Sequence, residues 1–207
     1  MTTVIHTILF DLGGVLIDWN PRYVYRDIFK TDAEMEWFLQ HICSNEWNEQ
    51  QDAGRSLQEG TEVLVAKHPQ WEKEIRAYYK RWPEMLGGPI PETVELFKQL
   101  KDKQLYKFYA LTNWSAETFP VALGRYDFLH WFDGILVSGA EGVRKPFPAY
   151  YALALQRFGL NPSEVVFIDD NLHNVEGASA AGIKTIHFQS AAQLEAALQK
   201  VLLRSVV

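Results

Sequence analysis

Polar side chains that suit phosphoryl chemistry follow several apolar runs of this 207-residue sequence; they are Asp11, Thr112-Asn113, Lys145 and Asp169-Asp170. Carboxylates such as Asp11 and Asp170 can share one Mg²⁺, an ion that prefers one or two carboxylates together with water and phosphate oxygens. The free oxygen of Asp11 would then attack phosphorus, while Thr112 donates to phosphoryl oxygens. Lys145 would stabilise transition-state charge and keep Asp11 ionised. These residue types predict phosphoryl transfer to Asp11.

The apolar runs that precede these residues have the length of buried strands. They span 4–10, 108–111, 134–138, 165–168 and 185–188, and helical patterns at about 91–104, 118–125, 149–158 and 191–203 alternate with them. Such alternation predicts an α/β fold with a doubly wound, mostly parallel, five-stranded, Rossmann-like sheet. Because parallel strands end at one edge of a sheet, we expect the polar side chains to meet there.

The segment from Asp18 to about Met85 differs from the rest of the chain. It has no strand-like run, and its apolar and aromatic residues recur at helical spacings. It also holds five of the seven tryptophans. We predict a helical cap domain at 17–85, inserted into an α/β core domain made of 1–16 and 86–207.

The composition narrows the possible partners. A formal charge of −6 argues against nucleic acid or an anionic membrane surface as a partner, because both select a basic face. Cys43 is the only cysteine, so no intrachain disulfide can form, and we expect a buried thiol in a reducing cytoplasm. No apolar window approaches the length of a membrane span. We expect a cytoplasmic protein with a small phosphorylated substrate; its oligomeric state has no signal in the sequence.

Taken together, the motifs resemble those of the haloacid dehalogenase (HAD) superfamily. Phe10 to Val15 is similar to its first motif, Leu111-Thr112-Asn113 to its second, 144–146 to its third and 167–174 to its fourth. The resemblance implies a magnesium-dependent phosphatase that forms an aspartyl-phosphate on Asp11. By the same resemblance, Asp11, the Gly13 carbonyl and Asp170 bind Mg²⁺, and Asp169 assists directly or through water.

One position departs from that pattern. Phosphatases of the superfamily usually carry a second Asp two residues after the nucleophile as general acid and base, and this chain has Gly13 there. Loss of such a group typically costs about 10²- to 10⁴-fold in rate. Similar glycine-containing motifs resemble those of sugar-phosphate phosphatases, including glucose 1-phosphate phosphatases. Because an anomeric hydroxyl is a good leaving group, we favour a sugar 1-phosphate as the substrate.

Two other functions stay open. A 2-haloacid dehalogenase would use Asp11 as a metal-independent nucleophile, with Arg22 and Asn113 binding the substrate carboxylate. The pair Asp169-Asp170 argues against it, because two carboxylates would repel that substrate. The second alternative is a catalytically weak phosphate-binding protein that has lost its general acid.

Substrate selection is expected to depend on the cap and on residues next to the second motif. The candidates are Trp19, Arg22, Trp47, Gln51 and Arg55 in the cap region and Trp114 after the second motif. Trp114 is the stronger candidate because its position is tied to the site, whereas tryptophans in the cap more often belong to a core.

Overall fold

The computed structural model describes residues 4–203, so positions 1–3 and 204–207 of the predicted core lie outside the described residues. A parallel sheet of five strands forms its centre, in the order β5-β4-β1-β6-β7. The strands are β1 (Thr7–Phe10), β4 (Lys107–Thr112), β5 (Gly134–Val137), β6 (Val165–Asp169) and β7 (Lys184–His187). This arrangement confirms the predicted fold class.

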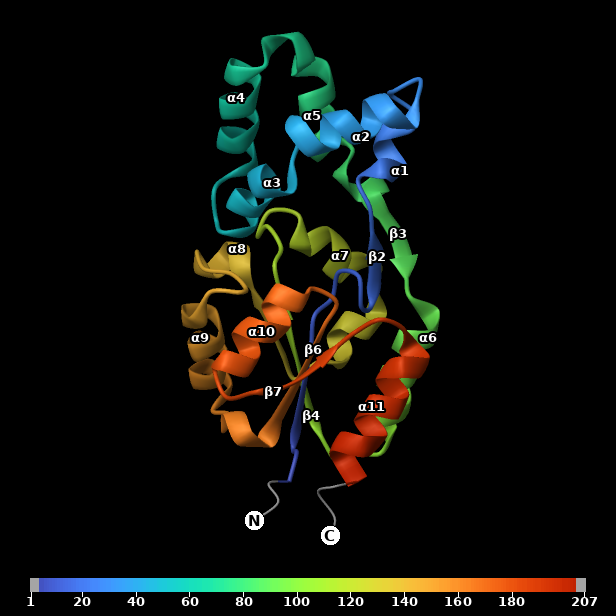
Figure 1. The fold of residues 1–207 in the computed structure, drawn as a ribbon, viewed down its shortest axis with the longest axis vertical. Coiled ribbons are helices and arrows are strands. Elements are labelled where there is room, and N and C mark those ends of the chain that lie inside the picture. Colours follow the sequence, from blue (N-terminus) through green and yellow to red (C-terminus); the bar gives the residue numbers. More distant parts are fainter. Residues whose placement is uncertain (1–3, 204–207) are drawn as a thin grey trace.

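Helices cover both faces of the sheet (Figure 1). One face packs on α6 (Pro91–Asp102), α7 (Phe119–Arg125) and α11 (Ala191–Leu203), and the other on α9 (Pro148–Phe158) and α10 (Leu172–Ala180). Alternate residues of β1 serve the two layers: Ile8 and Phe10 belong to one core cluster and Leu9 to the other. All three are fully buried, which explains the uninterrupted apolar run of this strand.

A helical region lies beyond the carboxyl ends of the strands, at the opposite end of the molecule from the two termini (Figure 1). It consists of α1 (Arg22–Tyr25), α2 (Asp32–His41), α3 (Asn45–Asp52), α4 (Leu57–Lys67) and α5 (Glu72–Lys80). Side chains at helical spacing form its core, including the buried Tyr25, Phe38 and Tyr78. Thr31 caps α2, since its side chain accepts a hydrogen bond from the backbone N–H of Glu34.

Two short strands connect this region to the sheet. β2 (Ile17–Trp19) and β3 (Leu86–Pro89) pair antiparallel, with Asp18 opposite Gly88. The prediction of no strand between Asp18 and Met85 was therefore wrong for Asp18 and Trp19. A three-residue strand has no measurable alternation, and its partner is distant in the sequence, so local periodicity could not reveal the pairing.

The remaining elements are single turns. They are η1 (Pro69–Trp71), η2 (Trp82–Met85), η3 (Asp127–Trp131), α8 (Ser138–Glu141) and η4 (Pro162–Glu164). Cys43 is a free, buried thiol, as expected. Among the helices of the described residues, none has both the length and the apolar character needed to cross a membrane.

Candidate active site

A lysine and two aspartates meet at the carboxyl end of the sheet. The Nζ atom of Lys145 lies 2.9 Å from Asp11 Oδ1 and 2.7 Å from Asp169 Oδ2. Lys145 and Asp169 are inaccessible to solvent, and Asp11 is 8% exposed. Asp11 follows β1 and Asp169 ends the neighbouring β6, so the parallel pairing of these strands sets the distance between the carboxylates.

Amide groups hold this cluster in place. Asn113 accepts from the backbone N–H of Lys145 at 2.9 Å and donates to the Lys145 carbonyl at 3.0 Å, which fixes the loop that carries the lysine. Asn174 donates to both carboxylate oxygens of Asp169 at 3.1 Å, and the backbone N–H of Asn171 donates to Oδ1 at 2.8 Å. With these bonds and the lysine contact, Asp169 is well supplied with donors and serves as a rigid support for Lys145.

Asp170 completes a group of three carboxylates that could hold a metal ion. One oxygen each from Asp11, Asp169 and Asp170 lies within 4.8 Å of the others. An all-oxygen set of this kind fits Mg²⁺. Gly14 makes room for it: its φ is +74°, and a Cβ atom there would lie 2.3 Å from Asp170 Oδ2. Only glycine therefore permits both this turn and the present position of Asp170.

The electrostatics of the cluster favour a bound cation. Burial is the main cause that raises the pKa of Asp11, the charges of Asp169 and Asp170 add to it, and Lys145 opposes it. The pKa of Asp170 is also raised, by burial and by Asp169. Burial opposes the charge of Lys145, yet Asp11 and Asp169 outweigh this effect and raise its pKa. The lysine therefore stays protonated, and the carboxylates have a shortage of positive charge that a metal ion would supply.

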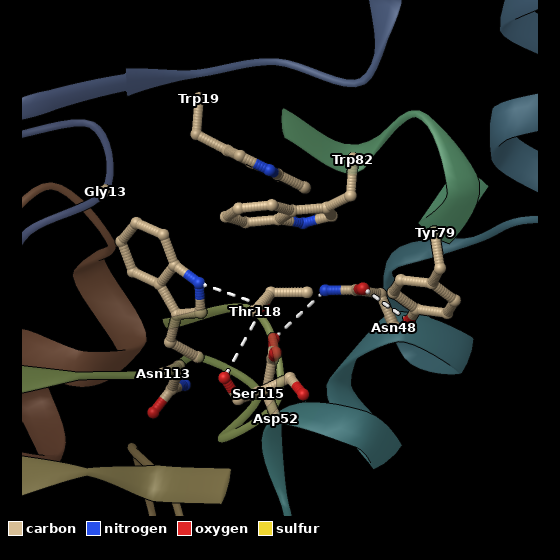
Figure 2. A pocket seen from close by; sticks show the side chains of 10 residues that line it. Gly13, Trp19, Asn48, Asp52, Tyr79, Trp82, Asn113, Ser115 and Thr118 are labelled. Carbon is tan, nitrogen blue, oxygen red and sulfur yellow. Dashed lines mark hydrogen bonds between the residues drawn. The ribbon is translucent and has the colours of Figure 1, made fainter. Parts of the chain in front are cut away.

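A cavity of about 80 Å³ lies beside the loops that carry the cluster, since Gly13 follows Asp11 by two residues and Asn113 bonds to the backbone of Lys145 (Figure 2). Gly13, Asn113, Trp114, Ser115 and Thr118 form its wall on the sheet side. The indole N–H of Trp114 donates to Thr118 Oγ1 at 3.1 Å, which fixes the ring. The structure thus places Asn113 and Trp114, two of the predicted binding residues, at the cavity. Thr112 ends β4 beside them and is 1% exposed.

Residues of β2, α3, α5 and η2 supply the opposite wall. Trp19, Asn48, Asp52, Tyr79 and Trp82 line it, and Figure 2 shows Asn48 and Asp52 on α3 across the cavity from the rings of Trp19 and Trp82. Trp19 was a predicted candidate, whereas the other four were missed. The polar segment 44–55 was the available signal, because it had already supplied Trp47, Gln51 and Arg55 as candidates.

Other predicted binding residues lie elsewhere. Trp47 packs inside the helical region, where its indole N–H donates to the Gly60 carbonyl at 2.9 Å. Arg22 forms a two-bond ion pair with Glu36 (Nη2 to Oε2, 2.7 Å) and lines a separate hollow between α1, α2 and α3. Neither residue lines the cavity, because each already has its partner within the helices.

Gln51 and Arg55 are also tied up inside the helical region. Gln51 is 1% exposed and donates to the Trp47 carbonyl and to Tyr79 Oη at 3.0 and 2.7 Å. Arg55 donates to Gln51 Oε1 at 2.7 Å. These two residues brace the helices that present the cavity wall.

Three contacts join the helical region to the loops at the sheet edge. Arg144 pairs with Glu49 of α3 at 2.6 Å, and Glu117 accepts from the backbone N–H of Leu57 at 2.8 Å. The Ser138 hydroxyl donates to the Asp52 carbonyl. These contacts therefore fix the two walls of the cavity relative to each other.

Comparisons with known proteins agree with this geometry. The family profile described as haloacid dehalogenase-like hydrolase matches residues 5–182. A sesquiterpene phosphatase of Aspergillus oryzae (strain ATCC 42149 / RIB 40) is 30% identical over 193 residues, which are 90% of this chain and 91% of the relative. The phosphorylated carbohydrates phosphatase of Thermotoga maritima (strain ATCC 43589 / DSM 3109 / JCM 10099 / NBRC 100826 / MSB8) is 26% identical over 183 residues, covering 87% and 83%.

A solved structure has the same fold. It is a HAD family enzyme of Bacteroides thetaiotaomicron, an Asp-to-Ala mutant in complex with magnesium and inorganic phosphate. Its TM-score is 0.68 at 24% identity, and the match covers 89% of this chain and 94% of that one.

Proposed function

The chain belongs to the haloacid dehalogenase-like hydrolase family, and we propose that it is a Mg²⁺-dependent phosphatase of small phosphorylated metabolites, with sugar phosphates as its substrate class. The observation that carries this proposal is the buried Lys145 between Asp11 and Asp169, with Asp170 completing a set of carboxylate ligands. Such a site neutralises and orients a phosphoryl group beside a carboxylate nucleophile.

Each group has a distinct part in the proposed reaction. One oxygen of Asp11 attacks phosphorus, and the bond to the leaving oxygen breaks, which leaves a phosphoryl group on Asp11. Thr112 and Asn113 at the end of β4 donate to the phosphoryl oxygens, and Lys145 stabilises their charge. Water then attacks phosphorus, releasing phosphate and restoring the Asp11 carboxylate. Trp114 lines the cavity, and its proposed part is to contact the leaving group there.

Asp11, the Gly13 carbonyl and Asp170 would hold Mg²⁺, with Asp169 supporting it. When bound, the ion supplies positive charge that offsets the phosphoryl oxygens and favours the ionised form of Asp11.

The cavity supports a small polar leaving group. Its volume of about 80 Å³ is far below the roughly 300–1,000 Å³ of pockets for drug-sized ligands. Asn48, Asp52 and Ser115 offer hydrogen-bonding groups, and the tryptophans offer flat apolar faces, a combination that suits a sugar. A long isoprenoid chain would need a wider opening. In this proposal residues 17–85 act as a cap that closes over the core and excludes water.

The test is phosphate release from a panel of sugar 1-phosphates, sugar 6-phosphates, farnesyl phosphate and pyrophosphate, with Mg²⁺ or with EDTA. The native chain is compared with Asp11→Asn. The control is Asp127→Asn, because Asp127 lies in η3, an element that carries none of the cluster residues. We expect turnover that needs both Mg²⁺ and Asp11, fastest with a sugar phosphate.

Other results would point to the alternatives. Halide release from 2-chloropropionate in EDTA, without phosphate release from any ester, would establish a dehalogenase. Phosphate binding without turnover of either kind would establish a binding protein.

A further inference from the structure

Gly13 leaves the position two residues after the nucleophile Asp11 without a side chain. A Cβ atom built on Gly13 meets nothing within 4 Å, so the backbone leaves open space where a side chain two residues after Asp11 would lie. Gly13 itself lines the cavity. A leaving alkoxide still needs a proton, and the attacking water must lose one. A carboxyl group on another part of the cavity wall would meet both needs.

Asp52 is the carboxyl group on that wall. It is the last residue of α3 and lines the same cavity as Gly13 and Asn113, from the opposite side. Its Oδ2 atom accepts from the Asn48 amide at 3.0 Å, which orients the carboxyl group. Among the described residues that line this cavity, it is the only Asp or Glu.

The backbone around Asp52 is tied to the second motif. The Asp52 carbonyl accepts from the Ser138 hydroxyl, and the same Ser138 oxygen accepts from the backbone N–H of Trp114 at 2.9 Å. Ser138 is fully buried. One side chain thus links the end of α3 to the residue two places after Thr112, so the carboxyl group keeps a fixed relation to the phosphoryl site when the helices lie as they do here.

The surroundings of Asp52 suit proton transfer at neutral pH. Burial is the main cause that raises its pKa to about 7, the charge of Glu49 adds to it, and Arg144 and the backbone N–H of Ser115 oppose it. Tyr78 and Tyr79 of α5 also face it; burial keeps both phenols protonated. A group with a pKa near the working pH can both donate and accept a proton, which is what the two halves of a phosphatase reaction need.

We propose that Asp52 is the general acid and base of this enzyme, in place of the carboxyl group that Gly13 lacks. Its proton passes to the leaving oxygen as the Asp11–phosphorus bond forms and the ester bond breaks. The Asp52 carboxylate then takes a proton from water as the water oxygen bonds to phosphorus and the Asp11–phosphorus bond breaks. Both protons are accounted for, and the role rests on the proposed phosphatase function.

The test compares two substrates in Asp52→Asn. With the best sugar phosphate of the panel, kcat should fall by about 10²- to 10⁴-fold, and the limb of the pH profile near 7 should vanish. With p-nitrophenyl phosphate, whose leaving group needs little protonation, the first step should remain fast and only water attack should slow. The variant should then release a burst of nitrophenolate equal to the enzyme concentration. Glu46→Gln, an acidic residue of the same helix that lines the separate hollow, is the matched control.

Rescue provides a second readout. Gly13 has open space and an ordinary φ, so Gly13→Asp should fold normally. Combined with Asp52→Asn, it should restore turnover of the sugar phosphate at least in part. The role of Asp52 would be overturned if Asp52→Asn kept the native rate and pH profile. It would also be overturned if the variant lost equal activity on both substrates and Gly13→Asp did not rescue it. If the native chain showed no turnover that requires Mg²⁺ and Asp11, the proposed phosphatase function itself would be overturned. Failure of the Asp52 role and failure of the phosphatase function are therefore distinguishable.

Discussion

Replacing Lys145 by methionine tests whether the lysine and the two carboxylates form one electrostatic unit. The side chain of Lys145 is 0% exposed, and its Nζ atom lies within 3 Å of an oxygen of both Asp11 and Asp169. Methionine has a similar length but removes the charge together with the N–H donors that bond to the carboxylates. Breaking a buried ion pair on one side costs about 3–5 kcal/mol, because an uncompensated charge stays behind. Asp169 keeps its bonds from Asn174, so we expect the lower end, about 3 kcal/mol at pH 8.

The loss in the free energy of unfolding of Lys145→Met should change with pH in a defined direction. Without Lys145 the carboxylates can avoid a buried charge only by binding protons, so the pKa of Asp11 moves further above its ordinary value. A carboxyl group with a raised folded pKa stabilises the fold below its unfolded pKa of about 4 and loses this contribution as the pH rises. The deficit of Lys145→Met should therefore be smallest in acid and largest at pH 8.

The assay is urea unfolding in EDTA at pH 5 and pH 8, so that no metal compensates for the missing charge. Lys107→Met is the matched control: Lys107 lies 3.1 Å from Asp133, but 67% of its side chain is exposed. Exposed pairs contribute about 0–1 kcal/mol, so this variant should stay near the native free energy of unfolding. Equal losses in the two variants, or a Lys145→Met deficit that does not change with pH, would refute the reasoning.

Two further predictions concern the metal site. Gly14→Ala should cost about 1–3 kcal/mol in urea unfolding and weaken Mg²⁺ binding in calorimetric titration, because its Cβ would strike Asp170. Gly13→Ala has open space and should behave like the native chain. Equal effects of the two substitutions would contradict this prediction. Burial raises the pKa of Asp11 to about 8 in the absence of metal, so Mg²⁺ must displace a proton. Its apparent affinity should rise up to about pH 8 with proton release to the buffer, and a flat profile would count against a metal on Asp11.

The strand-end residues were predictable because their positions follow from one rule. Each buried strand is an apolar run that stops at a polar residue, and parallel pairing brings those stops to the same edge. Lys145 is not at a strand end, because α8 separates it from β5, but the order of the motifs had already grouped it with Asp11 and Asp169. Local sequence was therefore sufficient for the half of the site that the sheet carries.

The half carried by the helices was not predictable in the same way. A tryptophan that packs in a core and one that lines a cavity satisfy the same apolar pattern, so the sequence could not separate Trp47 from Trp82. Arg22 shows the same difficulty for charge, because its partner Glu36 lies on another helix. Such assignments depend on how helices pack, and helical periodicity fixes only which face is apolar.

The division of the site between sheet and helices has a consequence for the reaction. The nucleophile and metal ligands lie on strand ends, and the contacts that hold Asp11 and Asp169 come from residues outside the helical region. The proposed proton donor, Asp52, is held in place by contacts between the helical region and the loops, above all the Ser138 hydroxyl. Phosphoryl transfer to Asp11 would then proceed with an alkyl leaving group only in the joined arrangement, when water is also excluded. A carboxyl group at position 13 would lie on the sheet side and remove this dependence, so Gly13→Asp should make turnover less sensitive to changes at Ser138.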